Sequence, residues 1–439
     1  MTEDQIAGLG PALTKYLGSF RRFFPRLPTF KHLGTYCRGL LSDLLRKSVE
    51  PMALAAGTAV RTLQEFFTHH AWDHGRLRDE IQRRIVRDHL PAPGAAPADG
   101  IGTVGWVDET SVAKKGGKTP GVQRQHCGAS GKIDNCIVTV HLAVNHGSFM
   151  SMLDSELFLP QKTWDQDRDR CREAHIPDSV VYRSKSDIAL EQIKRAVANG
   201  VRFDWLTFDE WYGSKPAFLA ELETMGLLYV AEVPRHLPCF PTLPKYRSLQ
   251  RPFQSKRADS AVIRGKPFRG KKWRKLSLTR KTLVPQVWEV KAEQVHLARG
   301  GQPTERTYWL IVARNRQTRE YKYFVSNAPP RTALTTLMKV AFTRAGVEHV
   351  FRIAKTEIGF SHFEGRSYRG LMRHMILCQL VMLFLAEQTN RLRGEKSRPD
   401  DGADRAGLEH AVPILVARPV PAITHQAHRS RHQLSPVKK

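Results

Sequence analysis

The sequence predicts a mixed α/β fold in which a sheet with flanking helices carries a β-rich insertion. Short apolar runs typical of strands alternate with amphipathic helices in residues 101–235. A second group of strand-like runs follows in 236–330, and helical spacing of apolar residues dominates 1–95 and 331–390. The chain has 439 residues, 41% of them hydrophobic, so it can bury a large core and form several domains.

The first 95 residues predict a helical region. Apolar residues recur at three- and four-residue spacing in 31–47 and 61–70, and again in 75–90, where the outer face is basic. Pro, Gly and Ala then fill 91–100, which is typical of a linker, and a domain boundary is expected there.

Residues 101–235 predict the first part of the sheet. The apolar run 101–108 ends in Asp108, and the run 203–209 ends in Asp209. A polar turn, NHGS, separates two further runs and indicates a hairpin. The remaining expected elements are strands at 121–128, 134–144, 149–160 and 227–233, and helices at 188–200 and 214–226.

Residues 236–330 predict a small β-rich insertion with a basic loop. Between Lys245 and Lys281 there are fourteen Lys or Arg residues and one acidic residue, Asp259. Such a run is typical either of a solvated loop or of a nucleic-acid contact. Interleaved aromatic residues favour the contact, since aromatic rings stack on unpaired bases. They are Tyr246, Phe253, Phe268 and Trp273; the strand-like runs are 286–297, 307–315 and 321–327.

The C-terminal part predicts helices and then a tail. Residues 331–360 and 367–390 show long helical patterns. The segment 391–439 is polar, basic and Pro-containing, so we expect it to be disordered.

The overall charge indicates a polyanionic partner. Lys and Arg number 69 against 42 acidic residues, a net charge of +27, which favours nucleic acid over a merely soluble or lipid-binding basic protein. No apolar run approaches the ~20 residues that span a bilayer, and no signal-peptide pattern begins the chain. We therefore expect a cytoplasmic protein without membrane contact. The six cysteines form no C-x-x-C pair, which indicates free thiols rather than a zinc site.

Two acidic doublets end apolar runs in the predicted sheet. They are Asp108 with Glu109, and Asp209 with Glu210. The first acid of each doublet is the candidate, because it ends the run at a sheet edge, where ligands bind in open α/β sheets. Acids at strand ends are also common as plain solvated caps.

Glu348 lies in a helical stretch among cations. Arg344 precedes it by four residues, and Arg352 and Lys355 follow by four and seven, so all share one helix face. The cations would keep the carboxylate ionised and contact phosphates beside it. The alternative is an ordinary salt-bridged surface helix. Strand carboxylates joined by a helix carboxylate are the ligands that a two-metal phosphoryl-transfer site needs.

Three segments together resemble the DDE transposases of bacterial insertion sequences: 107–128, 207–219 and 348–377. The resemblance extends over roughly 30–390, including the region around Trp72. It implies an RNase H-like catalytic domain formed by 101–235 and 331–390, which the β-rich insertion interrupts. It also implies that 1–95 contacts DNA ends.

The resemblance assigns catalysis and metal binding to Asp108, Asp209 and Glu348. Two Mg²⁺ ions would serve as cofactors, with Mn²⁺ able to substitute. The R-x₃-E-x₆-K signature of the related hairpin-forming group falls on Arg344, Glu348 and Lys355. The Tyr that this group places three residues before the Arg is Ala341 here.

The resemblance implies that the substrate is double-stranded DNA, which is cut at terminal inverted repeats and joined to a target. It also implies a homodimer that assembles on DNA in the nucleoid. The expected DNA contacts are Arg344, Arg352, Lys355, Lys271, Lys272, Arg274, Lys275 and the stacking residue Trp273. Trp288 and Trp309 lie in strand-like runs and are expected in the core. Four histidines are expected as phosphate contacts or structural hydrogen-bonders: His126, His349, His362 and His374.

Two other functions remain open from the sequence. One is a transposase-derived DNA-binding protein without catalysis, and the other is a nuclease on the same fold that cuts DNA and joins nothing.

Overall fold

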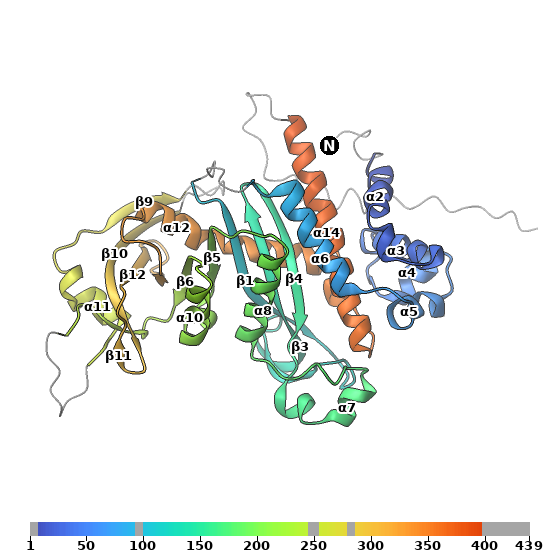
Figure 1. Cartoon of the computed structure of the whole chain (residues 1–439), viewed down its shortest axis with the longest axis horizontal. Coiled ribbons are helices and arrows are strands. Elements are labelled where there is room, and N and C mark those ends of the chain that lie inside the picture. The colour runs from blue at the N-terminus through green and yellow to red at the C-terminus, as the bar shows by residue number, and fades with distance from the viewer. Residues whose placement is uncertain (1–7, 93–99, 245–253, 279–285, 397–439) are drawn as a thin grey trace, which may run out of the picture.

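The structure is a computed structural model and describes residues 8–92, 100–244, 254–278 and 286–396. It shows a mixed α/β fold built around one large sheet (Figure 1). The N-terminal helices and the long helix α14 lie at one end of the sheet, and the insertion lies at the other.

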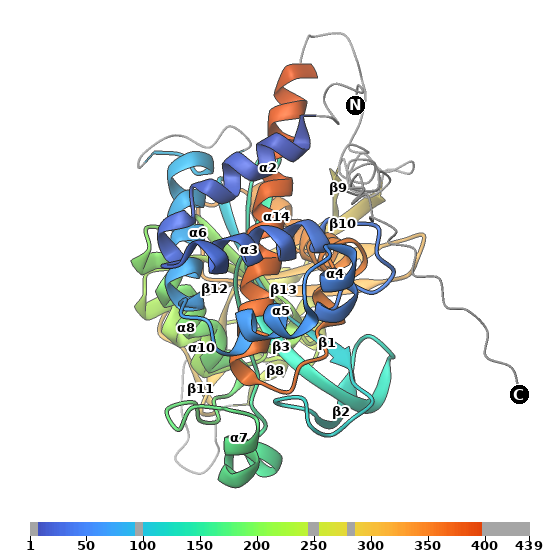
Figure 2. The same cartoon turned by 90° about the vertical axis from the view of Figure 1, so that its right-hand side faces the viewer.

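The N-terminal region folds as helices that pack on α14 (Tyr368–Lys396), as Figure 2 shows. Tyr16 Oη donates to the carbonyl of Leu380 at 2.8 Å, and Arg373 donates to four backbone carbonyls between residues 66 and 72. The region is therefore joined to the core by buried polar contacts. Its elements are α2 (Leu9–Gly18), η1 (Arg21–Phe23), α3 (Leu27–Leu40), α4 (Val49–Ala55), α5 (Val60–Thr68) and α6 (His74–His89).

Five strands form the central sheet in the order β4-β3-β1-β5-β6. Strand β3 is antiparallel to β1 and β4, whereas β1, β5 and β6 are parallel. This is the RNase H-like arrangement, and it confirms the predicted fold class. The elements are β1 (Thr103–Ala113), β2 (Gln123–Cys127), β3 (Lys132–His146), β4 (Phe149–Leu157), η2 (Gln161–Asp165), α7 (Arg168–Glu173), α8 (Lys185–Ala198), β5 (Trp205–Phe208), α9 (Glu210–Gly213), α10 (Pro216–Thr224) and β6 (Tyr229–Val233).

The insertion continues the same sheet. Strand β13 pairs antiparallel with β6, and the order then runs β13-β12-β10-β7-β8. The insertion is thus hydrogen-bonded into the central sheet. Its elements are β7 (Pro238–Phe240), β8 (Lys256–Arg257), α11 (Ala258–Arg264), η3 (Lys266–Phe268), β9 (Arg274–Leu278), β10 (Gln286–Arg299), β11 (Gln302–Pro303), β12 (Tyr308–Asn315) and β13 (Tyr321–Ser326).

The helix predicted over 331–360 is interrupted. It divides at Arg344 into α12 (Leu334–Thr343) and α13 (Ala345–Arg352), and then continues as η4 (Ile353–Glu357) and η5 (Phe360–His362). Gly346 sits directly on β1, because a Cβ there would lie 2.4 Å from Cη2 of Trp106. This close approach fixes α13 against the central strand.

Helix α14 is long and apolar enough, by length and composition, to cross a membrane over Tyr368–Leu392. An 18-residue apolar window of this helix is 94% buried within the protein, as expected of a core helix. The helix extends past residue 391 to Lys396, and the predicted disorder of 397–439 lies outside the described residues. All six cysteines are buried free thiols, as the sequence predicts.

Candidate active site

The strand register brings Asp108 and Asp209 to one level of the sheet. Val107 pairs with Phe208 across the parallel strands β1 and β5, and each acid is the next residue. The expectation that β1 ends at Asp108 is wrong, since β1 pairs with β3 as far as Ala113. What ends before Asp108 is the pairing with β5, so the carboxyl lies where the sheet opens between the two strands.

Asp209 is held by the helix that follows it. Its Oδ1 accepts hydrogen bonds from the backbone N–H groups of Trp211 and Tyr212 at 3.1 and 3.2 Å, which makes Asp209 the N-cap of α9. Gly213 lets this short helix lie on β6, because a Cβ there would fall 2.0 Å from the carbonyl oxygen of Glu232. The carboxylate is therefore positioned by the backbone.

Glu348 reaches the other acids through Arg344. Arg344 Nη1 lies 3.0 Å from Asp108 Oδ2, and its Nη2 lies 3.6 Å from Glu348 Oε1. The Glu348 side chain is 68% exposed, against 14% for Asp108. Within the described part of the chain, no three His, Cys, Asp or Glu side chains converge closely enough to hold a metal ion. Two of the three candidate acids, Asp108 and Glu348, thus contact one guanidinium.

Burial dominates the electrostatics of Asp108. It raises the pKa of this carboxyl to about 7, an effect that the Arg344 guanidinium opposes and the nearby Asp209 carboxylate reinforces. The Asp209 carboxylate therefore lies close enough to Asp108 to influence its pKa.

A further carboxylate, Glu232, belongs to the same level. The register continues from Thr207 to Val230, so Glu232 on β6 is in line with Asp108 and Asp209. Its Oε2 lies 4.0 Å from Arg344 Nε, and its Oε1 lies 2.9 Å from Lys322 Nζ. Sequence reasoning missed it, although Glu232 comes near the end of the apolar run 227–233 much as the two Asp residues end theirs.

Behind Asp108 lie Glu109 and Tyr212, which sequence reasoning also left without a role. Lys185 Nζ is 2.5 Å from Glu109 Oε1, while Glu109 Oε2 and the Tyr212 hydroxyl are buried without a hydrogen-bond partner. Burial raises the pKa of Tyr212 well above its ordinary value, and Glu109, Asp108 and Asp209 add to the rise. A buried phenol therefore faces three carboxyls. No sequence signal marks this contact, because Tyr212 follows Asp209 on a helix too short to show a pattern.

Of the two cations that follow Glu348, Lys355 lies near Asp108. Burial lowers the pKa of the Lys355 ammonium, which Asp108 partly offsets, so Lys355 faces the same site. Arg352 Nη2 lies 3.0 Å from His349 Nδ1.

The basic segment of the insertion is largely exposed. Lys271 pairs with Glu293 at 2.7 Å, and Lys272, Arg274 and Lys275 are exposed at or beside the start of β9. Trp273 is half-buried, with the guanidinium of Arg314 3.9 Å and the ammonium of Lys291 5.1 Å from its ring centre. A base that stacks on this face of Trp273 would have to displace Arg314.

Several of the other sequence candidates occupy structural positions. Trp288 and Phe268 are buried, and Trp309 donates to the carbonyl of Pro329 at 3.2 Å. Tyr246 and Phe253 lie outside the described residues. His374 is buried between Tyr36 Oη and the carbonyl of Phe360, and burial lowers its pKa to about 4. His362 Nδ1 accepts from the backbone N–H of Lys47 at 3.0 Å, and His126 is exposed on β2.

The donor set suits a hard divalent cation. Asp108, Asp209 and Glu348 offer only carboxylate oxygens, which Mg²⁺ and Mn²⁺ prefer over softer ligands. The orphaned hydroxyl of Tyr212 and the single guanidinium that joins Asp108 to Glu348 are consistent with an arrangement that tightens when a cation arrives. Arg344 would then have to release Asp108.

Comparison with known proteins matches the chain to one protein family and to one curated transposase. The family described as "DDE superfamily endonuclease" matches residues 22–294, which include Asp108 and Asp209 and stop before Glu348. The "Probable transposase for insertion sequence element IS701" of Microchaete diplosiphon is 29% identical over 221 residues, which are 50% of this chain and 53% of that protein. The chain thus spans about half the length of this curated relative.

Two solved structures overlap weakly. The piggyBac transposase synaptic complex with hairpin DNA gives a TM-score of 0.37 at 11% identity, over 96% of this chain and 85% of that one. The NurA nuclease from Sulfolobus solfataricus gives 0.24 at 10% identity, over 65% and 91%. TM-scores this low do not establish a shared fold, so the assignment to a family rests on the sequence match. That match covers more than half of the 439 residues, and the protein therefore belongs to the DDE superfamily of endonucleases, as a relative of the insertion-sequence transposases.

Proposed function

We propose that the protein is a cut-and-paste DNA transposase whose catalytic, metal-binding residues are Asp108, Asp209 and Glu348. The observation that supports this most is the register of β1 and β5, which sets the two Asp residues side by side at the opening of the sheet. The Arg344 guanidinium links Glu348 to Asp108, because it contacts both carboxylates.

Divalent ions, here proposed as two Mg²⁺, would supply nucleophile activation and stabilise charge on the leaving oxygen. The protein's own residues position the carboxylates and limit the access of water. Asp209 is kept in place by its cap on α9, and the depth of Asp108 excludes water from one side of the site. Asp108, Asp209 and Glu348 would hold the cations, and Arg344, Arg352 and Lys355 would bind the DNA phosphate.

The proposed substrate is double-stranded DNA bearing terminal inverted repeats, together with a target duplex. We propose that a homodimer assembles on these ends, that the helical region 1–95 contacts them, and that the reaction takes place in the cytoplasm on nucleoid DNA. The net charge of +27 and the exposed Lys272, Arg274 and Lys275 support this choice of substrate.

Cleavage of duplexes that carry the inverted repeats flanking the gene tests the proposal. Asp108→Ala should abolish Mg²⁺-dependent cutting and leave DNA binding intact. Asp178→Ala, which removes an 87% exposed carboxylate, is the matched control and should cut normally. Cutting that survives Asp108→Ala would refute the site.

A DNA-binding protein without catalysis is the second candidate, because Arg344 stands between Asp108 and Glu348. Tight binding with no cutting in either Mg²⁺ or Mn²⁺ would favour it. Cutting of unrelated or branched DNA without strand transfer would indicate a nuclease instead.

A further inference from the structure

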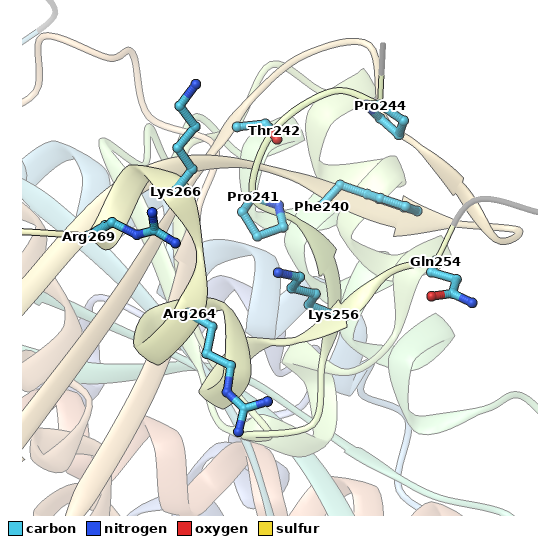
Figure 3. A pocket seen from close by; sticks show the side chains of 9 residues that line it. All are labelled: Phe240, Pro241, Thr242, Pro244, Gln254, Lys256, Arg264, Lys266 and Arg269. Atoms are coloured by element: carbon cyan, nitrogen blue, oxygen red, sulfur yellow. The ribbon is translucent and has the colours of Figure 1, made fainter. Parts of the chain in front are cut away.

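The insertion contains a basic pocket far from the candidate acids. It is about 450 Å³ in volume, and Figure 3 shows it between β7, β8, α11 and η3. Gly265 closes the turn beside it, since a Cβ there would fall 2.3 Å from the carbonyl oxygen of Ala261. Its lining is Phe240, Pro241, Thr242, Pro244, Gln254, Lys256, Arg264, Lys266 and Arg269.

Four exposed cations line this pocket from three elements: Lys256 on β8, Arg264 on α11, and Lys266 and Arg269 on and after η3. In the view of Figure 3, Lys256 and Arg269 extend from opposite sides toward Pro241. No acidic side chain is among the described lining residues. The neighbouring pairs Arg257–Asp259 (2.7 Å) and Lys271–Glu293 (2.7 Å) lie outside the lining. Four like charges around one cavity repel one another, and an anion in the cavity relieves that repulsion.

We propose that this pocket, named here the insertion pocket, binds backbone phosphates of duplex DNA, as a second DNA contact of the proposed transposase. The charge of the lining selects phosphate, and its spread over three elements suits consecutive phosphates of one strand better than a single small ion. Thr242 and Gln254 add neutral hydrogen-bonding groups at the rim.

The strand order gives an approximate distance between this pocket and the candidate acids. Six strand-to-strand steps separate β1 from β7 along the path through β5, β6, β13, β12 and β10. At ~4.8 Å per step, and allowing for offset along the strands, the pocket lies about 30 Å from Asp108. A duplex that runs along the sheet covers this with about 9 base pairs at ~3.4 Å each. The insertion pocket should thus hold phosphates about 9 base pairs from the cut.

The salt dependence of binding to a 40-base-pair duplex of random sequence tests the proposal without any need for cutting. Each phosphate contact adds about 0.9 to the slope of log affinity against log salt. The variant K256Q/R264Q/K266Q/R269Q should lower that slope by about 2 or more. The charge-preserving variant K256R/R264K/K266R/R269K should keep it.

The matched control removes four exposed cations from the core, in K162Q/R172Q/K194Q/R202Q, and should change the slope by less than about 1. Equal losses in the pocket variant and this control would overturn the proposal, as would no loss in either. Binding of tripolyphosphate that the pocket variant abolishes, with the duplex slope unchanged, would identify a small anion as the ligand and also overturn it.

Ethylation interference on inverted-repeat DNA then locates the contact. Wild-type binding should be blocked by modified phosphates about 9 base pairs from the cut, and the pocket variant should lose only that signal. Interference confined to the immediate cut site would contradict the placement. Failure of the protein to cut would count against the proposed function and would leave the slope result standing.

Discussion

At the scale of single residues, the buried Asp108 makes stability depend on pH. Its folded pKa of about 7 is above the ordinary 3.8, so between these values the folded protein holds a proton that the unfolded chain has lost. The free energy of unfolding should therefore fall as pH rises from about 4 to 7, by up to ~1.4 kcal/mol per unit, and level off above that. Asp108→Asn should lose this dependence.

Urea unfolding in buffer with EDTA, at intervals between pH 4 and 8, measures the difference between wild type and Asp108→Asn. The exposed substitution Asp178→Asn serves as control and should follow wild type. Parallel curves for wild type and Asp108→Asn would show that Asp108 is ionised throughout.

The buried hydroxyl of Tyr212 is the second residue-scale feature with a measurable consequence. It has no partner in the structure and faces Glu109, Asp108 and Asp209. If it donates to one of them during the reaction, Tyr212→Phe should slow cleavage about tenfold, which corresponds to one hydrogen bond of about 1.4 kcal/mol. Stability should not fall, because the hydroxyl that is removed has no hydrogen bond to lose, and DNA affinity should stay at the wild-type value. An unchanged single-turnover cleavage rate would exclude this role.

At the scale of elements, the contact between α13 and β1 determines where Glu348 lies. Gly346→Ala would place a methyl group 2.4 Å from Trp106 Cη2, in the packed core, and should displace α13 from the sheet. Cleavage should fall at least tenfold while DNA binding persists. Trp106→Leu in the same chain opens space at that point and should restore part of the cleavage rate.

Gly116→Ala is the control for this test, since nothing lies within 4 Å of a Cβ at Gly116. A Gly346→Ala protein that cuts at the wild-type rate would show that the position of α13 does not matter.

The sequence predicted elements whose signals are local. The strands that carry Asp108 and Asp209 were visible as apolar runs, and the spacing of Arg344 and Glu348 predicted their contact, which the structure shows at 3.6 Å. What escaped prediction depends on partners far away in the chain. The approach of Gly346 to Trp106 joins α13 to a strand more than 200 residues away, and β1 continues past Asp108 because β3 pairs with it.

The same reason explains the residues that sequence analysis missed around the site. Glu232 joins the two Asp residues only through the register of three strands, which no local pattern reveals. The position of Tyr212 beside Glu109, Asp108 and Asp209 likewise depends on residues from two separate parts of the chain.

At the scale of the whole molecule, Arg373 ties the N-terminal helices to the core. Its guanidinium donates to the carbonyls of Phe66, Phe67, His70 and Trp72, and it is 3% exposed. Arg373→Met should lower the free energy of unfolding by about 3 kcal/mol or more, because several buried carbonyls lose charged donors. The N-terminal helices should also become sensitive to protease.

Arg369→Met is the control, since Arg369 makes one exposed bond to the carbonyl of Thr68. It should cost less than about 1 kcal/mol. Equal urea midpoints for Arg373→Met and Arg369→Met would show that α14 holds these helices by apolar packing alone.

The pairing of β13 with β6 has a further consequence for how the molecule handles its substrate. A domain attached only by loops can change its position relative to the rest of the protein. The insertion is hydrogen-bonded through its backbone to the edge of the central sheet, so its distance from that sheet stays constant. Longer outer strands in the insertion should leave this distance unchanged. Substitutions that disrupt the pairing of β6 with β13 should instead make the position of DNA cleavage less uniform. The backbone would then set the distance between the DNA contact in the insertion and the phosphodiester bond that is cut.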